Sequence, residues 1–142
     1  MLNSAAVLVV EDDRSTQGLL VAIVKHLGLD ARIAGDGHVA LTMIAEWTPQ
    51  VIILDLIMPE MDGFEVLREL KRTWPDLLAC TIVVTAAAIR NFEKYPELDL
   101  VRKFLRKPLD IDQLGSAVLG CVGKSLSEKA GRDGAYKTPL RP

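Results

Sequence analysis

The stretch from residue 51 to residue 63 constrains the fold of this chain more than any other. Residues 51–54 form an unbroken apolar run rich in β-branched side chains, which is typical of a strand buried on both faces of a parallel sheet. Asp55 follows directly, and Pro59 and the Asp62-Gly63 pair then predict a loop and a turn. An acid at the carboxyl end of a buried parallel strand lies where open α/β sheets bind ligands.

The rest of the chain alternates between short apolar runs and segments of helical periodicity. The runs predict strands at residues 7–10, 31–34, 82–84 and 101–106. Helical periodicity predicts helices near residues 15–27, 39–44, 64–73 and 111–122, the first of them capped by Ser15. Strands that alternate with helices predict an α/β fold, in which a parallel sheet is covered on both faces.

Length and charge limit the classes of protein to consider. A chain of 142 residues with 49% hydrophobic and 25% charged residues suits one domain with a substantial core. Its net charge of −2 gives no electrostatic reason to expect direct binding to nucleic acid or to a membrane surface. The chain also begins without the pattern of a signal peptide and has no apolar run of membrane length. We therefore expect a cytoplasmic protein.

Acidic, hydroxyl and cationic side chains follow the predicted strands. Because the carboxyl ends of parallel strands share one edge of a sheet, this edge should gather the residues Glu11, Asp12, Asp55, Thr85 and Lys107. Three neighbouring carboxylates repel one another, and hard oxygen ligands favour Mg²⁺. A hydroxyl and an ammonium group can hold phosphate oxygens. This combination predicts phosphoryl transfer onto a carboxylate, with Asp55 as the nucleophile. Asp13 is either a further ligand or a solvated or capping residue, and we favour the second interpretation.

Four motifs carry a resemblance to a known family. They are Leu8-Val-Val-Glu-Asp-Asp13, Leu54-Asp-Leu-Ile-Met-Pro-Glu-Met-Asp-Gly63, Val84-Thr-Ala86 and Phe104-Leu-Arg-Lys-Pro108. In their order and spacing the chain resembles the receiver domain of response regulators in two-component signalling. The resemblance extends over nearly all of residues 5–123.

The resemblance assigns roles residue by residue. It implies that Asp55 is the phosphoacceptor and that Lys107 pairs with the phosphoryl group. Mg²⁺ would be held by Asp12 and Asp55, by Glu11 through water, and by the main-chain carbonyl of Ile57. Thr85 and Phe104 would form the switch, with Thr85 bonding a phosphoryl oxygen after activation. No organic cofactor is implied, and the Lys107-Pro108 peptide bond is expected to be cis.

The resemblance also implies the fold, the activity and the partners. The expected fold is a flavodoxin-like (βα)₅ three-layer sandwich with strand order 2-1-3-4-5. The expected function is a phosphorylation-dependent signalling switch that catalyses only its own phosphorylation and dephosphorylation. A sensor histidine kinase or a histidine phosphotransfer protein would supply the phosphoryl group. The face made by helix four, strand five and helix five would then contact a downstream effector or form a homodimer.

Two features depart from the family pattern. Pro96 interrupts the segment where helix four is expected, so that helix should be short, broken or displaced. Ile57 and Ala87 stand two residues after Asp55 and Thr85, at positions that tune hydrolysis of the acyl phosphate in the family. Because neither side chain can orient a water molecule by hydrogen bonding, we expect a long-lived phosphorylated form.

The chain is expected to divide into a receiver domain at residues 1–123 and a tail or linker at residues 124–142, without an output domain. The main alternative is a docking module that works without phosphorylation. A phosphatase would need a second acid where Ile57 stands, and a flavin carrier would need a phosphate-cradling loop in place of the acids that follow residue 10.

Overall fold

The computed structural model describes residues 6–86, 88–90 and 92–132, with the backbone alone for 124–132. Its five strands are all parallel, in the order β2-β1-β3-β4-β5, as predicted. The strands are β1 (Ala6–Val10), β2 (Asp30–Ala34), β3 (Val51–Leu54), β4 (Thr81–Thr85) and β5 (Lys103–Arg106). The fifth strand therefore begins two residues later than the predicted residue 101.

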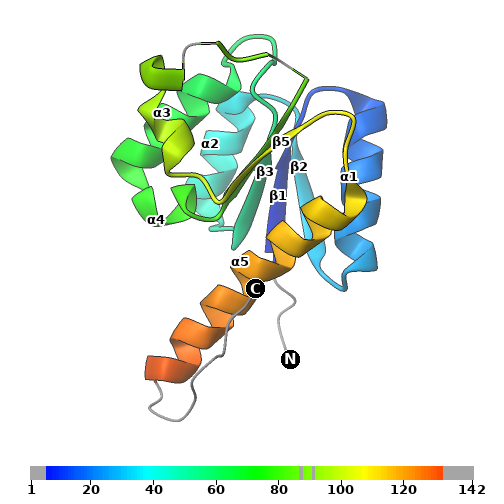
Figure 1. Cartoon of the computed structure of the whole chain (residues 1–142), viewed down its shortest axis with the longest axis vertical. Coiled ribbons are helices and arrows are strands. Elements are labelled where there is room, and N and C mark those ends of the chain that lie inside the picture. Colours follow the sequence, from blue (N-terminus) through cyan, green and yellow to red (C-terminus); the bar gives the residue numbers. More distant parts are fainter. Residues whose placement is uncertain (1–5, 87, 91, 133–142) are drawn as a thin grey trace.

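Helices cover the sheet on both faces and make it the middle of three layers (Figure 1). They are α1 (Arg14–His26), α2 (Gly37–Glu46), α3 (Gly63–Thr73), the single turn α4 (Pro75–Leu78) and α5 (Ile111–Arg132). Side chains of β1 alternate between the layers: Leu8 packs with residues of α2 and α3, whereas Val9 packs with residues of α1 and α5. All residues of β3 are buried, as a strand between two helical layers requires.

The helix boundaries correct three details of the prediction. Asp13, not Ser15, caps α1, because the Asp13 side chain accepts the bond from the Thr16 amide. The turn α4 was not predicted; Pro75 ends α3 but is itself well placed in the first turn of a new helix. Helix α5 continues to Arg132 instead of ending at residue 122. Gly123 alone does not stop it, since the residues that follow are mostly good helix formers and proline first returns at Pro139.

The sequence predicted that the helix expected between the fourth and fifth strands, which is helix four of the family and not α4, would be interrupted, and this is confirmed. Between β4 and β5 the described residues form two 3₁₀ turns, η1 (Phe92–Lys94) and η2 (Pro96–Asp99). No helix in the described part of the chain is long and apolar enough to span a membrane. Ala87 and the tail from residue 133 onward lie outside the described residues, so the predictions for them are not tested.

Candidate functional site

Three carboxylates converge at the carboxyl ends of the two central strands. Glu11 and Asp12 follow β1, and Asp55 follows β3. Backbone bonds extend the sheet to these residues: the Glu11 amide donates to the carbonyl of Ala34, and the Asp55 amide donates to that of Val10, each at 3.0 Å. One carboxylate oxygen from each acid lies within 4.8 Å of the others. The edge therefore assembles the acidic cluster that the strand pattern predicts.

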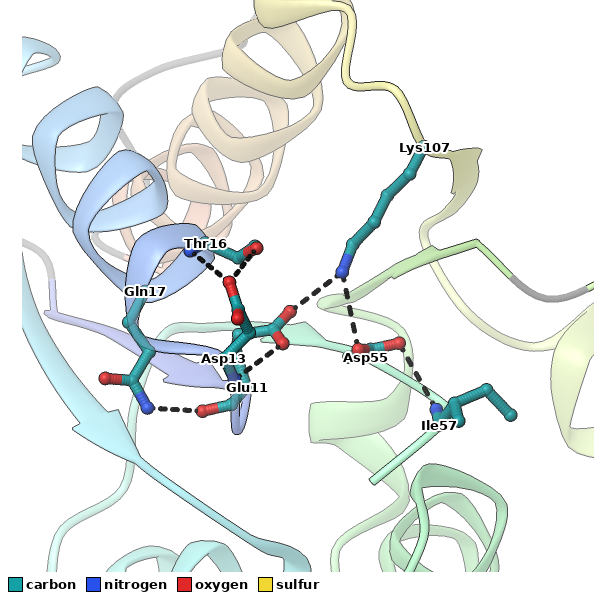
Figure 2. A network of polar contacts seen from close by, with 7 residues as sticks. All are labelled: Glu11, Asp13, Thr16, Gln17, Asp55, Ile57 and Lys107. Carbon is teal, nitrogen blue, oxygen red and sulfur yellow. Dashed lines mark hydrogen bonds and ion pairs between the residues drawn. The ribbon is translucent and has the colours of Figure 1, made fainter. Parts of the chain in front are cut away.

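Lys107 supplies the positive charge of this cluster (Figure 2). It follows β5, and its Nζ lies 3.1 Å from Glu11 Oε1 and 3.4 Å from Asp55 Oδ2. The other oxygen of Asp55 accepts a hydrogen bond of 3.2 Å from the Ile57 amide. Both carboxylates are buried, so this cation and these donors offset part of the cost of removing them from water.

These charges shift the pKa values of Glu11 and Lys107. Burial raises the pKa of Glu11, the nearby charge of Asp55 adds to the rise, and hydrogen bonds from the Asp13 amide and Lys107 oppose it. Burial by itself would lower the pKa of Lys107, but its bonds and charge interactions with Glu11 and Asp55 outweigh burial and raise it. Lys107 thus stays charged, while the charge of Glu11 remains less than fully compensated.

The first turn of α1 holds the loop that carries Glu11 and Asp12. The Asp13 amide donates to Glu11 Oε2 at 3.1 Å, and the Asp13 carboxylate accepts two bonds of 2.8 Å from Thr16. These bonds lower the pKa of Asp13 and confirm it as a cap. Gln17 Nε2 also donates to the Glu11 carbonyl at 2.6 Å. The sequence did not predict this role of Gln17, because the hydrogen-bond partner of a glutamine side chain in a helix cannot be read from the sequence.

Thr85 and Phe104 lie on the neighbouring strands. Thr85 is completely buried at the end of β4, and its carbonyl accepts a 2.9 Å bond from the Lys107 amide. Phe104 on β5 is half-buried, and its ring meets that of Phe92 edge-on at 5.7 Å. The Lys107-Pro108 peptide bond is cis, as predicted. The hydroxyl, the ammonium group and the acids therefore end on adjacent strands.

The cluster suits a hard divalent cation. Its three carboxylates offer oxygen ligands, those of Glu11 and Asp55 are buried, and burial raises the pKa of Glu11 despite its bond to Lys107. Glu11, Asp12 and Asp55 are the residues that could hold such an ion. Outside the cluster, His26 and His38 are exposed, as ordinary surface histidines are. Asp62 caps α3 in a capping box with Glu65.

Comparisons with known proteins agree with this geometry. Residues 7–119 match the family described as response regulator receiver domain. The response regulator MprA of Mycobacterium bovis is 33% identical over 135 residues, which cover 94% of this chain and 57% of the relative. The chain thus spans about half the length of the curated relatives it matches.

Two solved structures extend the comparison. The receiver domain of a signal transduction histidine kinase from Syntrophus aciditrophicus has a TM-score of 0.75 and 28% identity, covering 85% of this chain and 92% of its own. The response regulator TrrA from Thermotoga maritima, solved with Mg²⁺ and BeF, has a TM-score of 0.73 and 25% identity, covering 82% and 98%. From the matched residues, the strand order and the acidic edge, the chain belongs to the response regulator receiver domains of two-component systems.

Proposed function

We propose that Asp55 accepts a phosphoryl group and that this modification switches the chain between two signalling states. The position of Asp55 carries the proposal. Its carboxylate is buried at the end of β3, lies 3.4 Å from the Lys107 ammonium group and shares its edge with two further acids. A carboxylate in such surroundings can attack phosphorus while neighbouring positive charge stabilises the charge that develops on the phosphoryl oxygens.

The acidic cluster would hold the Mg²⁺ ion that this transfer needs. Asp12 and Asp55 would bind it directly, Glu11 through water, and the main-chain carbonyl of Ile57 would complete the protein ligands. Bound there, the ion would neutralise phosphoryl oxygens. The phosphoryl donor would be a phosphorylated histidine of a partner protein. An Asp55 oxygen forms a bond to phosphorus as the bond between phosphorus and the histidine nitrogen breaks. The imidazole that leaves takes up a proton. Lys107 then pairs with a phosphoryl oxygen in place of Asp55 Oδ2.

Thr85 and Phe104 would pass the change on to the surface. The phosphoryl group adds about −1.5 to −2 charges, which draws the Thr85 hydroxyl inward and lets Phe104 follow. The contact between Phe104 and Phe92 supports this route, because it joins β5 to η1. The face formed by the segment of η1 and η2, β5 and α5 would then contact an effector or a second copy of the chain.

The donor would be a sensor histidine kinase or a histidine phosphotransfer protein. We assign the receiver to residues 1–123 and a tail or linker to residues 124–142, and a cytoplasmic location follows from the family resemblance.

A long-lived phosphorylated form is also part of the proposal. Ile57 supports it, since its amide bonds to Asp55 Oδ1 while its side chain, which is 57% exposed, cannot orient a water molecule by hydrogen bonding. Faster dephosphorylation of Ile57→Asn, followed by intact mass over time, is the expected outcome; an unchanged rate would contradict this part.

Intact mass after incubation with phosphoramidate and Mg²⁺ tests the proposal. We expect one phosphoryl adduct on the wild-type chain and none on Asp55→Asn or in the presence of EDTA. Asp76→Asn, which changes an exposed acid on α4, is the matched control and should react like the wild type. An adduct that persists in Asp55→Asn would move the acceptor elsewhere. No adduct at all would favour the docking module that works without phosphorylation.

A further inference from the structure

A pocket of about 260 Å³ lies next to the phosphoacceptor loop, between α3 and the segment that replaces helix four. Among the residues that line it are Ile57, Phe64, Ile89, Arg90, Lys94 and Tyr95. They come from the loop after β3, from the start of α3 and from the segment around η1. The pocket therefore lies on the α3 side of η1, whereas the Phe92–Phe104 contact joins η1 to β5.

The departure from a regular helix four shapes this pocket. Tyr95, between η1 and η2, stacks on Phe64 of α3 with ring centroids 4.2 Å apart and an angle of 31°. Pro96 directly after Tyr95 begins a new turn, so the chain bends at this point instead of continuing as a helix. The stacked pair forms one aromatic wall, and Ile57, which is 57% exposed, lies open to solvent beside it.

The charged residues that line the pocket are both positive. Arg90 and Lys94 are both exposed, and among the described residues no acid lines the pocket. Within the described part of the chain neither cation takes part in an ion pair, whereas Lys107 and Arg72 do. Two exposed cations that line a pocket together with apolar and aromatic side chains complement a group that is apolar at its tip and carries carboxylates on either side.

The volume of the pocket limits the size of the group that it can bind. Sites for small organic ligands usually enclose about 300–1,000 Å³, and this pocket falls below that range. It suits one large side chain, such as an anchoring residue at the centre of a protein interface. We propose that this pocket docks an acidic segment of a partner protein, which inserts one phenylalanine or leucine side chain against Ile57 and Tyr95 while its carboxylates pair with Arg90 and Lys94.

Ile57 would link this docking to phosphorylation. Its side chain lines the pocket, and its amide donates to Asp55 Oδ1 at 3.2 Å. A phosphoryl group on Asp55 would change the partner of that amide and with it the position of the pocket wall. Docking would then favour one phosphorylation state, and that state would favour docking to the same degree. This coupling, unlike the docking itself, rests on the proposed phosphorylation of Asp55.

A titration with a designed peptide tests the docking. The probe is a short peptide with one phenylalanine between glutamates, added to the unmodified full chain labelled with ¹⁵N. We expect amide shifts centred on the residues that line the pocket. Arg90→Glu/Lys94→Glu should weaken binding by about tenfold or more. Arg68→Glu/Lys103→Glu changes the charge equally at two exposed cations outside the lining and should bind the probe at least threefold more tightly than the first double variant.

Three results would overturn the docking proposal. They are shifts centred elsewhere or absent, equal losses in both double variants, and equal binding of a probe with lysines in place of its glutamates. A probe with serine in place of phenylalanine should lose binding, because it lacks the anchor. Folding of each variant is checked by its amide spectrum before the titration.

The coupling is tested by repeating the titration with Mg²⁺ and beryllium fluoride, which mimics the phosphoryl group. A change of at least threefold in probe affinity, absent in Asp55→Asn, supports the coupling. If the adduct forms on Asp55 but probe affinity stays the same, the coupling is wrong and the docking stands. If no adduct forms while the probe still binds, the proposed phosphorylation fails and the docking again stands.

Discussion

The edge that carries the acids and the segment between β4 and β5 are built in opposite ways. At the edge, residues far apart in sequence hold one another: Asp55 bonds to β1 through its amide and to Lys107 through its carboxylate. Around η1 and η2, the backbone bonds are local. The amides of Tyr95 and Leu100 donate to carbonyls only three residues earlier in the chain. The backbone bonds of the edge cross between strands, whereas those of η1 and η2 stay within single turns.

The difference indicates how a receiver can keep its chemistry while its surface varies. A displaced side chain at the edge would disturb the neighbouring strands, because their backbone bonds and charges meet there. A change in the segment of η1 and η2 leaves those bonds intact. The proline between β4 and β5 therefore alters the surface that we propose as a binding site without altering the strands that position Asp55.

Hydrogen exchange should separate the two regions by the largest margin. The Ile52 and Asp55 amides bond into the sheet, whereas the Tyr95 and Leu100 amides close single turns. Opening a central strand requires nearly global unfolding, but a short turn opens locally. We expect exchange of the first pair to be slower by about a thousandfold or more, measured residue by residue by NMR. Equal protection would show that the segment is as firmly held as the sheet.

Truncating a leucine in each region should give the next largest contrast. Leu54 on β3 is completely buried, whereas Leu100 after η2 is 49% exposed. Leu54→Ala should lower the free energy of unfolding by about 2–5 kcal/mol, since it leaves a cavity between strand and helices. Leu100→Ala should change it by no more than about 0.5 kcal/mol. Denaturant unfolding of both variants measures the difference, and a similar loss in both would refute the contrast.

The same two regions explain what the sequence could predict. The site was predictable because parallel topology sends every strand end to one edge, so Glu11, Asp55 and Lys107 could be placed together from their positions after apolar runs. Pro96 likewise predicted the break in helix four. Gln17 could not be predicted, since its bond to the Glu11 carbonyl depends on how α1 sits over the loop. The pocket also could not, because it requires the stacking of Phe64 on Tyr95.

Helix capping gives a smaller contrast between the regions. Asp62 and Glu65 form a capping box at the start of α3, next to the phosphoacceptor loop, whereas Tyr95 before η2 provides no side-chain cap. Asp62→Ala should cost about 1 kcal/mol of unfolding free energy, because the Glu65 amide loses its acceptor. Asp62→Asn keeps an acceptor oxygen and should lose much less. Equal losses in the two variants would assign the effect to charge instead of capping.

The pH dependence of the metal-free chain should show the smallest effect, because opposing contributions act on Glu11. Burial and the charge of Asp55 raise its pKa, while the Asp13 amide and Lys107 lower it, and the net direction is upward. The folded state therefore binds this proton more tightly than the unfolded state does, so stability should fall as pH rises from 4.5 through the raised pKa.

The other shifted groups act outside that interval. The lowered pKa of Asp13 makes its contribution present above 3.8 and lost below it, and the raised pKa of Lys107 makes its contribution present below 10.5. Glu11→Gln in EDTA should thus remove the fall and leave the acid contribution of Asp13 unchanged. It should also reduce the alkaline contribution of Lys107, because Glu11 helps to raise the pKa of Lys107. Denaturant unfolding at several pH values compares the two chains. A fall that persists in Glu11→Gln would mean that another group at the edge, and not Glu11, carries the uncompensated charge.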